Sequence, residues 1–191
     1  MKPDVCSTAS GSFAGPAEPA VQDSNPSLKV PQDTGGNIPE PEEMTRQLDD
    51  LARVATIMVD GDVCQRIPTA NASDPNQEAF TQTKKTLLRL SLLVSFPCDL
   101  NLWMPVSGKP DRVQIVIRDN NEFSQFWQSE RVEQDLLPPM KSVLETGQRI
   151  TVAEKPPWIS VLAPLHNSLG DIVGFVEVVS TKSPGCGTRL A

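Results

Sequence analysis

The sequence predicts an α+β fold in which a five-stranded antiparallel sheet is covered by helices on one side. Apolar residues recur every three or four positions up to about residue 96, as on one face of a helix, and every second position after residue 100, as in strands. Short Gly-containing turns then join successive strands, which is possible for antiparallel neighbours but not for parallel ones. We therefore expect a helix-rich beginning followed by a layered sheet domain.

The first 40 residues differ in composition from the rest of the chain. Seven of the 18 prolines fall within the first 41 residues, and Phe13 is the one aromatic residue there. Such a segment buries too little apolar area to offset the entropy lost on ordering. We expect four parts: a disordered Pro-rich tail at 1–40, a helix and connector at 41–74, the α+β domain at 75–181 and a flexible C-terminal tail at 182–191.

A long helix is predicted at 41–59. Pro41 suits the first helical position, and Glu42 and Glu43 complement the positive end of the helix dipole. Gly61 can end the helix. A competing interpretation places a hairpin around the turn-forming pair Asp60-Gly61, and we favour the helix because its apolar spacing begins well before that turn. The apolar positions follow a heptad pattern, which indicates a dimerisation helix: Met44, Leu48, Leu51, Ala55 and Met58.

A second helix is predicted from its start and stop signals. Asp74 can cap its N-terminus, Pro75 suits its first turn and Gln77 completes a capping box. Pro97 ends it, because the residue before a proline is disfavoured in a helix.

The remaining elements follow from periodicity and from breaking residues. Residues 122–147 are predicted to be mostly helical, in two pieces separated at Pro138-Pro139, with Gly147 as the C-cap of the second piece, 140–146. The last strand is almost continuously apolar, so we expect it to be central and covered on both faces. The expected strands are 100–105, 113–118, 149–153, 158–165 and 171–180.

Composition and charge exclude several classes of function. The formal net charge is −7, which argues against a nucleic-acid or anionic-membrane partner because phosphate binding needs a cationic surface. The longest apolar run, 87–96, is shorter than a membrane span and contains Arg89. No signal-peptide pattern is present at the N-terminus. We expect a soluble, cytoplasmic protein.

The chain carries few signs of catalysis. It has no nucleophile elbow, no zinc-protease motif, no Walker phosphate loop and no dinucleotide-binding glycine motif. Its one histidine, His166, lies in a predicted turn and is expected to be exposed. The four cysteines Cys6, Cys64, Cys98 and Cys186 show no paired spacing, which disfavours zinc and thioredoxin-like chemistry. For Cys98 we favour a packing role over redox sensing or catalysis.

Five residues are candidates for contact with a ligand. Trp103 and Trp127, with Trp158, either line a cavity or pack in the core. Glu177 lies inside an apolar strand, where a carboxylate costs several kcal/mol unless it is paired or exposed, so it either faces the surface or belongs to a polar site. The candidate set is Trp103, Arg118, Trp127, Ser160 and Glu177.

Residues 140–180 contain a helix ending in Thr146-Gly147, a strand ending in Ala163-Pro164-Leu165, a turn containing Gly170 and an apolar strand containing Gly174. This pattern resembles the C-terminal half of GAF and Cache sensory domains, which belong with PAS domains to a broad group of signal-sensing α+β folds. It implies a sensory module. Cache domains usually have flanking membrane helices, so the absence of such helices here favours GAF or PAS. We expect Gly174 to allow close approach of a helix or ligand.

Three functions follow as hypotheses. The first is a non-enzymatic sensory or regulatory module that binds a small molecule or a protein partner and signals through the N-terminal helix, as a homodimer. The second is an interaction or dimerisation scaffold without a ligand. The third is a thiol-dependent redox enzyme, as some GAF-type proteins are, and it is disfavoured because it needs several cysteines around one pocket. The sequence names no cofactor and no ligand.

Overall fold

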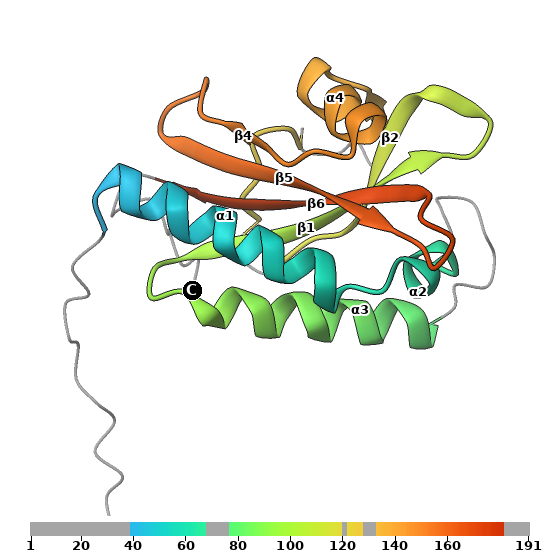
Figure 1. Cartoon of the computed structure of the whole chain (residues 1–191), viewed down its shortest axis with the longest axis horizontal. Helices are drawn as coiled ribbons and strands as arrows, with labels where there is room; N and C mark the ends of the chain where they lie inside the picture. Colours follow the sequence, from blue (N-terminus) through green and yellow to red (C-terminus); the bar gives the residue numbers. More distant parts are fainter. Residues whose placement is uncertain (1–38, 68–76, 120–121, 128–132, 182–191) are drawn as a thin grey trace, which may run out of the picture. The chain divides into compact units, whose positions relative to one another are not determined.

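The computed structural model describes residues 39–67, 77–119, 122–127 and 133–181. In these residues the fold is α+β, with a single antiparallel sheet in the order β3-β2-β1-β6-β5-β4 (Figure 1). The sheet has six strands, so the prediction of five is wrong. The elements in chain order are α1 (Pro41–Met58), α2 (Gly61–Gln65), α3 (Gln77–Leu90), the 3₁₀ helix η1 (Ser91–Leu93), β1 (Cys98–Val106), β2 (Lys109–Ile117), β3 (Glu133–Asp135), α4 (Pro138–Thr146), β4 (Ile150–Val152), β5 (Trp158–His166) and β6 (Ile172–Thr181).

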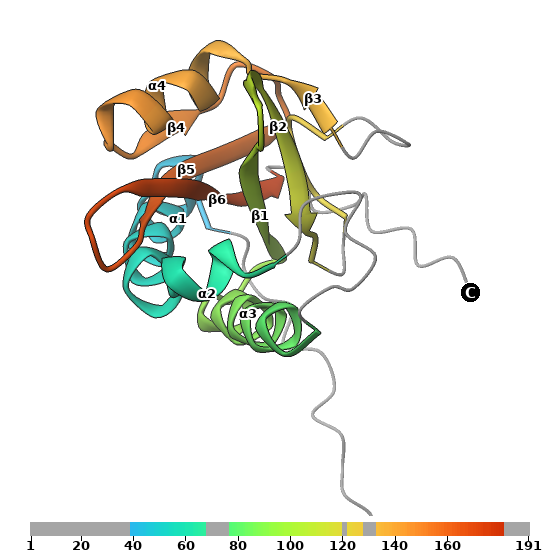
Figure 2. The same cartoon turned by 90° about the vertical axis from the view of Figure 1, so that its right-hand side faces the viewer.

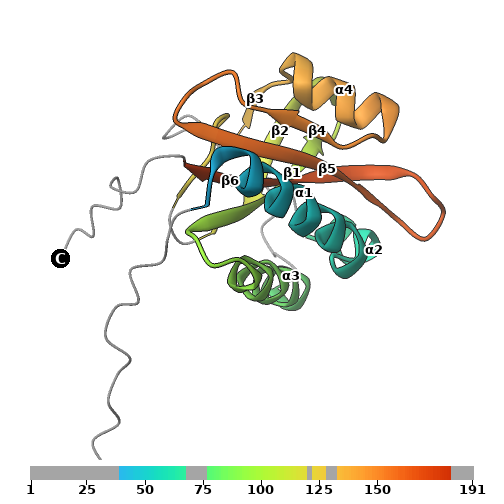
Figure 3. The same ribbon diagram turned by 60° about the vertical axis from the view of Figure 1, so that its left-hand side comes forward.

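The helices cover both faces of the sheet, not one. Figures 2 and 3 show α1, α2 and α3 on one side and α4 on the other. Met140 and Val143 of α4 are fully buried in a cluster with Trp103 and Phe175, apart from the cluster under α1 to α3. The one-sided prediction is wrong because this short amphipathic helix buries its apolar residues on the opposite face.

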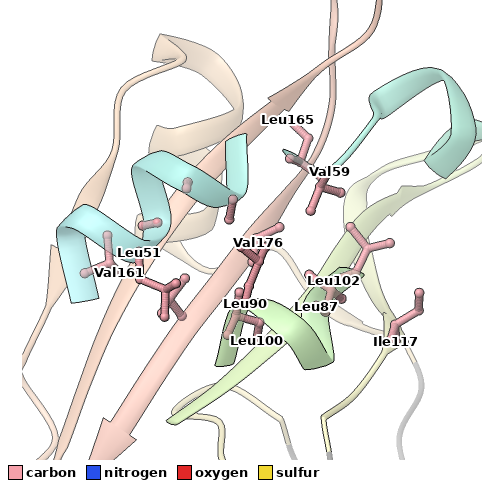
Figure 4. Close-up of a cluster of buried hydrophobic side chains, with 14 of the residues drawn as sticks. Leu51, Val59, Leu87, Leu90, Leu100, Leu102, Ile117, Val161, Leu165 and Val176 are labelled. Carbon is pink, nitrogen blue, oxygen red and sulfur yellow. The ribbon is translucent and has the colours of Figure 1, made fainter. Parts of the chain in front are cut away.

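The first predicted helix is confirmed as α1, and the competing hairpin is wrong. Leu48, Leu51 and Ala55 are buried against the sheet, and Figure 4 shows Leu51 in the same cluster as Val161 of β5. Four of the five heptad residues proposed for dimerisation are therefore buried within the chain, while the fifth, Met58, is exposed. Gly61 begins α2 instead of capping α1: the side chain of Asp60 accepts from the backbone N–H groups of Asp62 and Val63, a typical N-cap.

The chain between β2 and α4 departs most from expectation. The described residues 122–127 contain no helix or strand, and β3 forms where the first helical piece was predicted. Tertiary contacts explain the difference. β3 pairs with β2, and the ion pairs Lys109–Glu133 (2.8 Å) and Arg112–Asp135 (2.7 Å) join the two strands. The second piece is confirmed as α4, and Gly147 ends it in the left-handed conformation with φ of 67°.

The last strand lies at the centre of the sheet, as predicted. β6 pairs with β1 on one side and β5 on the other, and the side chains from Val173 to Ser180 are buried. A Cβ atom at Gly174 would lie 2.5 Å from the Trp103 carbonyl oxygen. A glycine is thus required here because the backbone of β1 lies so close. The expected close approach is made by this neighbouring strand, and not by a helix or a ligand.

Some predictions fall outside the described residues. These are residues 1–38 of the tail predicted at 1–40, the tail at 182–191, the capping residues Asp74 and Pro75, and Cys6 and Cys186. Of the helices that are described, none combines the length and apolar character needed to span a bilayer.

Candidate functional site

A polar cluster lies on the face of the sheet that α4 covers. Side chains alternate between the two faces of a strand, so in β1 the apolar Leu100 and Leu102 face α1 to α3, while Asn101 and Trp103 face the other way. Asn101 pairs across the strands with Glu177 of β6. The strand pairing thus places polar groups from β1 and β6 together at the middle of the sheet.

Glu177 is the centre of this cluster. Its side chain is fully buried, and its two carboxylate oxygens accept five hydrogen bonds from groups that all act as donors here. The donors to Oε2 are Trp103 Nε1 (3.0 Å), Asn101 Nδ2 (3.3 Å) and Ser124 Oγ (2.7 Å), and those to Oε1 are Gln125 N (3.0 Å) and Ser160 Oγ (3.2 Å). The surface interpretation of Glu177 is wrong, and the polar-site interpretation holds.

The charge on Glu177 is stabilised by dipoles instead of by a cation. Among the described residues no Lys, Arg or His forms an ion pair with it. Burial raises the pKa of this carboxyl, and the hydrogen bonds from Ser124, Gln125, Trp103 and Asn101 oppose that rise. Two of the opposing donors come from outside the sheet, so the environment of Glu177 depends on how that outside segment is placed.

That segment is residues 122–127, which we call the covering segment. Ser124 Oγ donates to Glu177 and accepts from the backbone N–H groups of Phe126 and Trp127 (3.1 and 3.0 Å). Phe123 N donates to Asp99 (2.7 Å), and Asn101 Nδ2 donates to the Phe123 carbonyl (2.7 Å). An irregular piece of backbone is therefore attached to the sheet through side chains of β1 and β6.

The side chain of Gln125 lies beside the same carboxylate. It is 8% exposed, and its Nε2 donates to the Val152 carbonyl (2.7 Å) and to Ser160 Oγ (3.0 Å). The Val152 carbonyl can only accept, so it fixes which end of the amide is the nitrogen. The other end, Oε1, has no hydrogen-bond partner among the residues that the structure describes. An acceptor in this state is unusual in a buried position.

Arg118 and Trp127 meet at the edge of the cluster. The guanidinium carbon lies 3.9 Å from the centre of the Trp127 ring, a cation–π contact, and Nη1 is 3.7 Å from Glu122 Oε1. Both side chains are half-buried. The next residue, Asp119, links β2 to β1, because its Oδ2 accepts from Leu100 N (3.3 Å) and its N donates to Asn101 Oδ1 (3.3 Å).

The five predicted site residues fall into two groups in the structure. Trp103, Ser160 and Glu177 contact one another through the carboxylate, while Arg118 and Trp127 contact each other. Trp103 does not line a cavity there: it is 1% exposed and its ring lies parallel to that of Phe175, with centroids 6.2 Å apart. Sequence reasoning missed four members of the cluster: Asp99, Asn101, Ser124 and Gln125. Only Asp99 and Asn101 carried a usable signal, because they are polar positions within β1.

Neither the two described thiols nor the histidine donates a hydrogen bond to Glu177. Cys98 is buried, as the packing interpretation predicted, and so is Cys64. Burial raises the pKa of each thiol to about 12, which disfavours the reactive thiolate. His166 is exposed, as expected, but it is the last residue of β5 and precedes the turn. No group of three metal-ligating side chains is found in the described residues.

A surface hollow is found on the opposite side of the sheet. It has a volume of about 20 Å³ and lies where α1 ends and α2 and α3 meet. Its lining residues are Met58, Val59, Asp60, Val63, Gln82, Thr83 and Thr86. This hollow includes none of the polar groups around Glu177.

The polar cluster combines a buried carboxylate, an unpartnered buried acceptor and an irregular segment that supplies donors. The sequence matches no protein-family model and no curated protein.

Proposed function

We propose that this chain is a non-enzymatic sensory or regulatory module that binds a small molecule or a protein partner on the α4 side of the sheet, between the covering segment and Glu177. The observation that carries the proposal is a fully buried carboxylate to which an irregular segment supplies two donors, Ser124 Oγ and Gln125 N. The proposal includes kinship with the GAF, PAS and Cache group and a cytoplasmic location.

Exchange of donors is the proposed means of sensing. A ligand that offers hydrogen-bond donors to Glu177 competes with Ser124 and Gln125, since a buried carboxylate must keep its hydrogen bonds. Binding then shifts the covering segment between two positions, and the Arg118–Trp127 contact at the end of that segment shifts with it. The change reaches the surface because both of these side chains are partly exposed.

The state of the described thiols supports a non-enzymatic role. A thiol-dependent reaction needs a thiolate that substrate can reach, and Cys64 and Cys98 are both buried with raised pKa values. Loss of a sulfoxide-reducing activity in Cys98→Ser would contradict this part of the proposal.

A second candidate is a dimerisation scaffold without a ligand. One observation favours it: Trp103 packs tightly, 1% exposed and parallel to Phe175, instead of bordering an open cavity. Because Met44, Leu48, Leu51 and Ala55 of the heptad face are buried within the chain, such a dimer could not be built on these four residues.

Native mass spectrometry of the full chain separates the two candidates. The regulatory proposal expects a retained small molecule, or one gained from a metabolite mixture, that is lost in Glu177→Gln. The matched control is Glu145→Gln, which changes an exposed carboxylate on α4. A dimer without any bound molecule supports the scaffold, and a monomer that neither retains nor gains a molecule overturns the regulatory proposal.

A further inference from the structure

We infer that the Glu177 site takes a planar cation with paired N–H donors, an amidinium or guanidinium group, attached to an apolar body. The inference rests on the proposed function and names the chemical class of its ligand. Three observations, each made on the described residues, lead to it. The covering segment divides its donors between the two carboxylate oxygens, no cation forms an ion pair with the carboxylate, and Oε1 of Gln125 has no hydrogen-bond partner.

The division of donors defines a bidentate pattern. The covering segment gives one hydrogen bond to each oxygen of Glu177, from Ser124 Oγ to Oε2 and from Gln125 N to Oε1. The remaining donors belong to the strands: Trp103 and Asn101 of β1 donate to Oε2, and Ser160 of β5 donates to Oε1. A replacement must therefore present one donor to each oxygen. Two parallel N–H groups in one plane, as in amidinium and guanidinium, have this geometry.

The local charge favours a cation over a neutral or anionic ligand. Glu177 is fully buried and forms no ion pair with the described residues. An anion would meet like charge in a low-dielectric environment, whereas a cation would compensate the buried carboxylate.

Gln125 supplies an acceptor for a further N–H. Its side-chain nitrogen is bound to Val152 and Ser160, so the amide is attached to β4 and β5 separately from its own backbone N–H. Its Oε1 has no hydrogen-bond partner among the described residues, although the residue is 8% exposed. Amidinium and guanidinium carry N–H groups beyond the pair that a carboxylate engages, and one of these can satisfy this oxygen.

The surroundings suit an apolar body behind the cation. Phe123 and Trp158 contact edge to face, with centroids 5.4 Å apart, and the cluster beneath α4 contributes Trp103 and Phe175. Aromatic rings stabilise a planar cation or a ring stacked near them. The expected ligand thus combines a forked N–H cation with an aromatic or aliphatic group.

Benzamidine tests the inference, because it joins an amidinium to an apolar ring. Binding to the full chain is measured by calorimetry, in parallel with benzamide, which has similar shape without the charge, and benzoate, which is an anion. We expect benzamidine to bind at least about 10-fold more tightly than benzamide, as charge-assisted hydrogen bonds imply, and benzoate not to bind. Equal affinities for benzamidine and benzamide would overturn the inference, and this comparison needs no variant.

Variants then locate the binding. Glu177→Gln should weaken benzamidine about 10-fold or more, and Glu145→Gln on the outside of α4 should leave the affinity unchanged. Equal loss in both variants would show attraction to the acidic surface only and would overturn the inference. If Glu177→Gln does not fold, hydrogen exchange on the unmodified chain replaces it: benzamidine should deprotect the amide of Gln125, and unchanged exchange overturns the inference. A molecule retained in native mass spectrometry that benzamidine does not displace would contradict the ligand class while leaving the regulatory function intact.

Discussion

The two faces of the sheet differ in how they are held. The face under α1, α2 and α3 is largely apolar: Leu100, Leu102 and Val176 are almost fully buried in one hydrophobic cluster there (Figure 4). The face under α4 carries Asn101, Ser160 and Glu177, all buried. The first face gains stability from buried apolar area, which depends little on the direction of each contact. The second face depends on hydrogen bonds, whose strength changes with direction and distance. The same strands thus supply a stable support and a responsive surface.

The largest predicted effect concerns the apolar face. Leu102→Ala should lower the free energy of unfolding by about 2–5 kcal/mol, because it removes buried methyl groups and leaves a cavity. Urea titration followed by far-UV circular dichroism measures it. Leu92→Ala, at a residue 80% exposed, is the control and should change stability by less than about 0.5 kcal/mol. Similar losses in the two variants would mean that this face does not dominate stability.

On the polar face, Trp103→Phe should cost about 1.5–3 kcal/mol. It keeps the ring in place against Phe175 but removes the N–H that donates to the buried Glu177. Trp158→Phe, at a half-buried ring, should cost less in the same urea titration. A larger loss at Trp158 would show that ring packing, not the hydrogen bond to the carboxylate, governs this face.

The stability contributed by Glu177, on the polar face, should depend on pH. The pKa of Glu177 is raised from 4.5 by burial, so the folded chain holds this proton more tightly than the unfolded chain does. The contribution of Glu177 to the free energy of unfolding is therefore greatest below pH 4.5 and is lost as pH rises through the raised pKa. The difference in stability between the unmodified chain and Glu177→Gln, measured from pH 4 to 8, should fall with rising pH. A difference that grows with pH would reverse the assigned direction.

The smallest global effect, and the most local one, is predicted for Ser124→Ala. The hydroxyl joins the covering segment to Glu177 and accepts from two backbone N–H groups. Stability should fall by about 1 kcal/mol, while hydrogen exchange at Phe126 and Trp127 should accelerate markedly. Ser142→Ala on α4 is the control and should leave that exchange unchanged. Equal protection of the two amides in both variants would show that the segment is held by other contacts.

Periodicity predicted the regular elements because their signals are local. The spacing of apolar residues in α1, the alternation in β1 and the nearly continuous apolar run of β6 each lie within one element. The side on which α4 packs, the irregular backbone of residues 122–127 and the strand β3 were not predictable in this way. They depend on partners far along the chain, such as Glu177, which lies 53 residues from Ser124.

The candidate site was found in part for the same reason. Glu177, Ser160 and Trp103 stand out as polar or amphipathic residues inside apolar strands. Ser124 and Gln125 belong to a segment without periodic apolar spacing. They can be recognised as site residues only from their hydrogen bonds to Glu177. Asn101 was overlooked although its place in β1 is regular, because an amide in a strand most often faces solvent.

The central position of β6 has a consequence for how the protein is made. β6 lies between β1 and β5, so the half of the sheet that contains β1, β2 and β3 is joined to the half that contains β4 and β5 through this strand. During synthesis, β1 emerges from the ribosome long before its partner at residues 172–181. Until β6 is synthesised, the edge of β1 that pairs with β6 has no partner strand. Long-range pairing of this kind slows folding, and the exposed apolar strand is a site for chaperone binding.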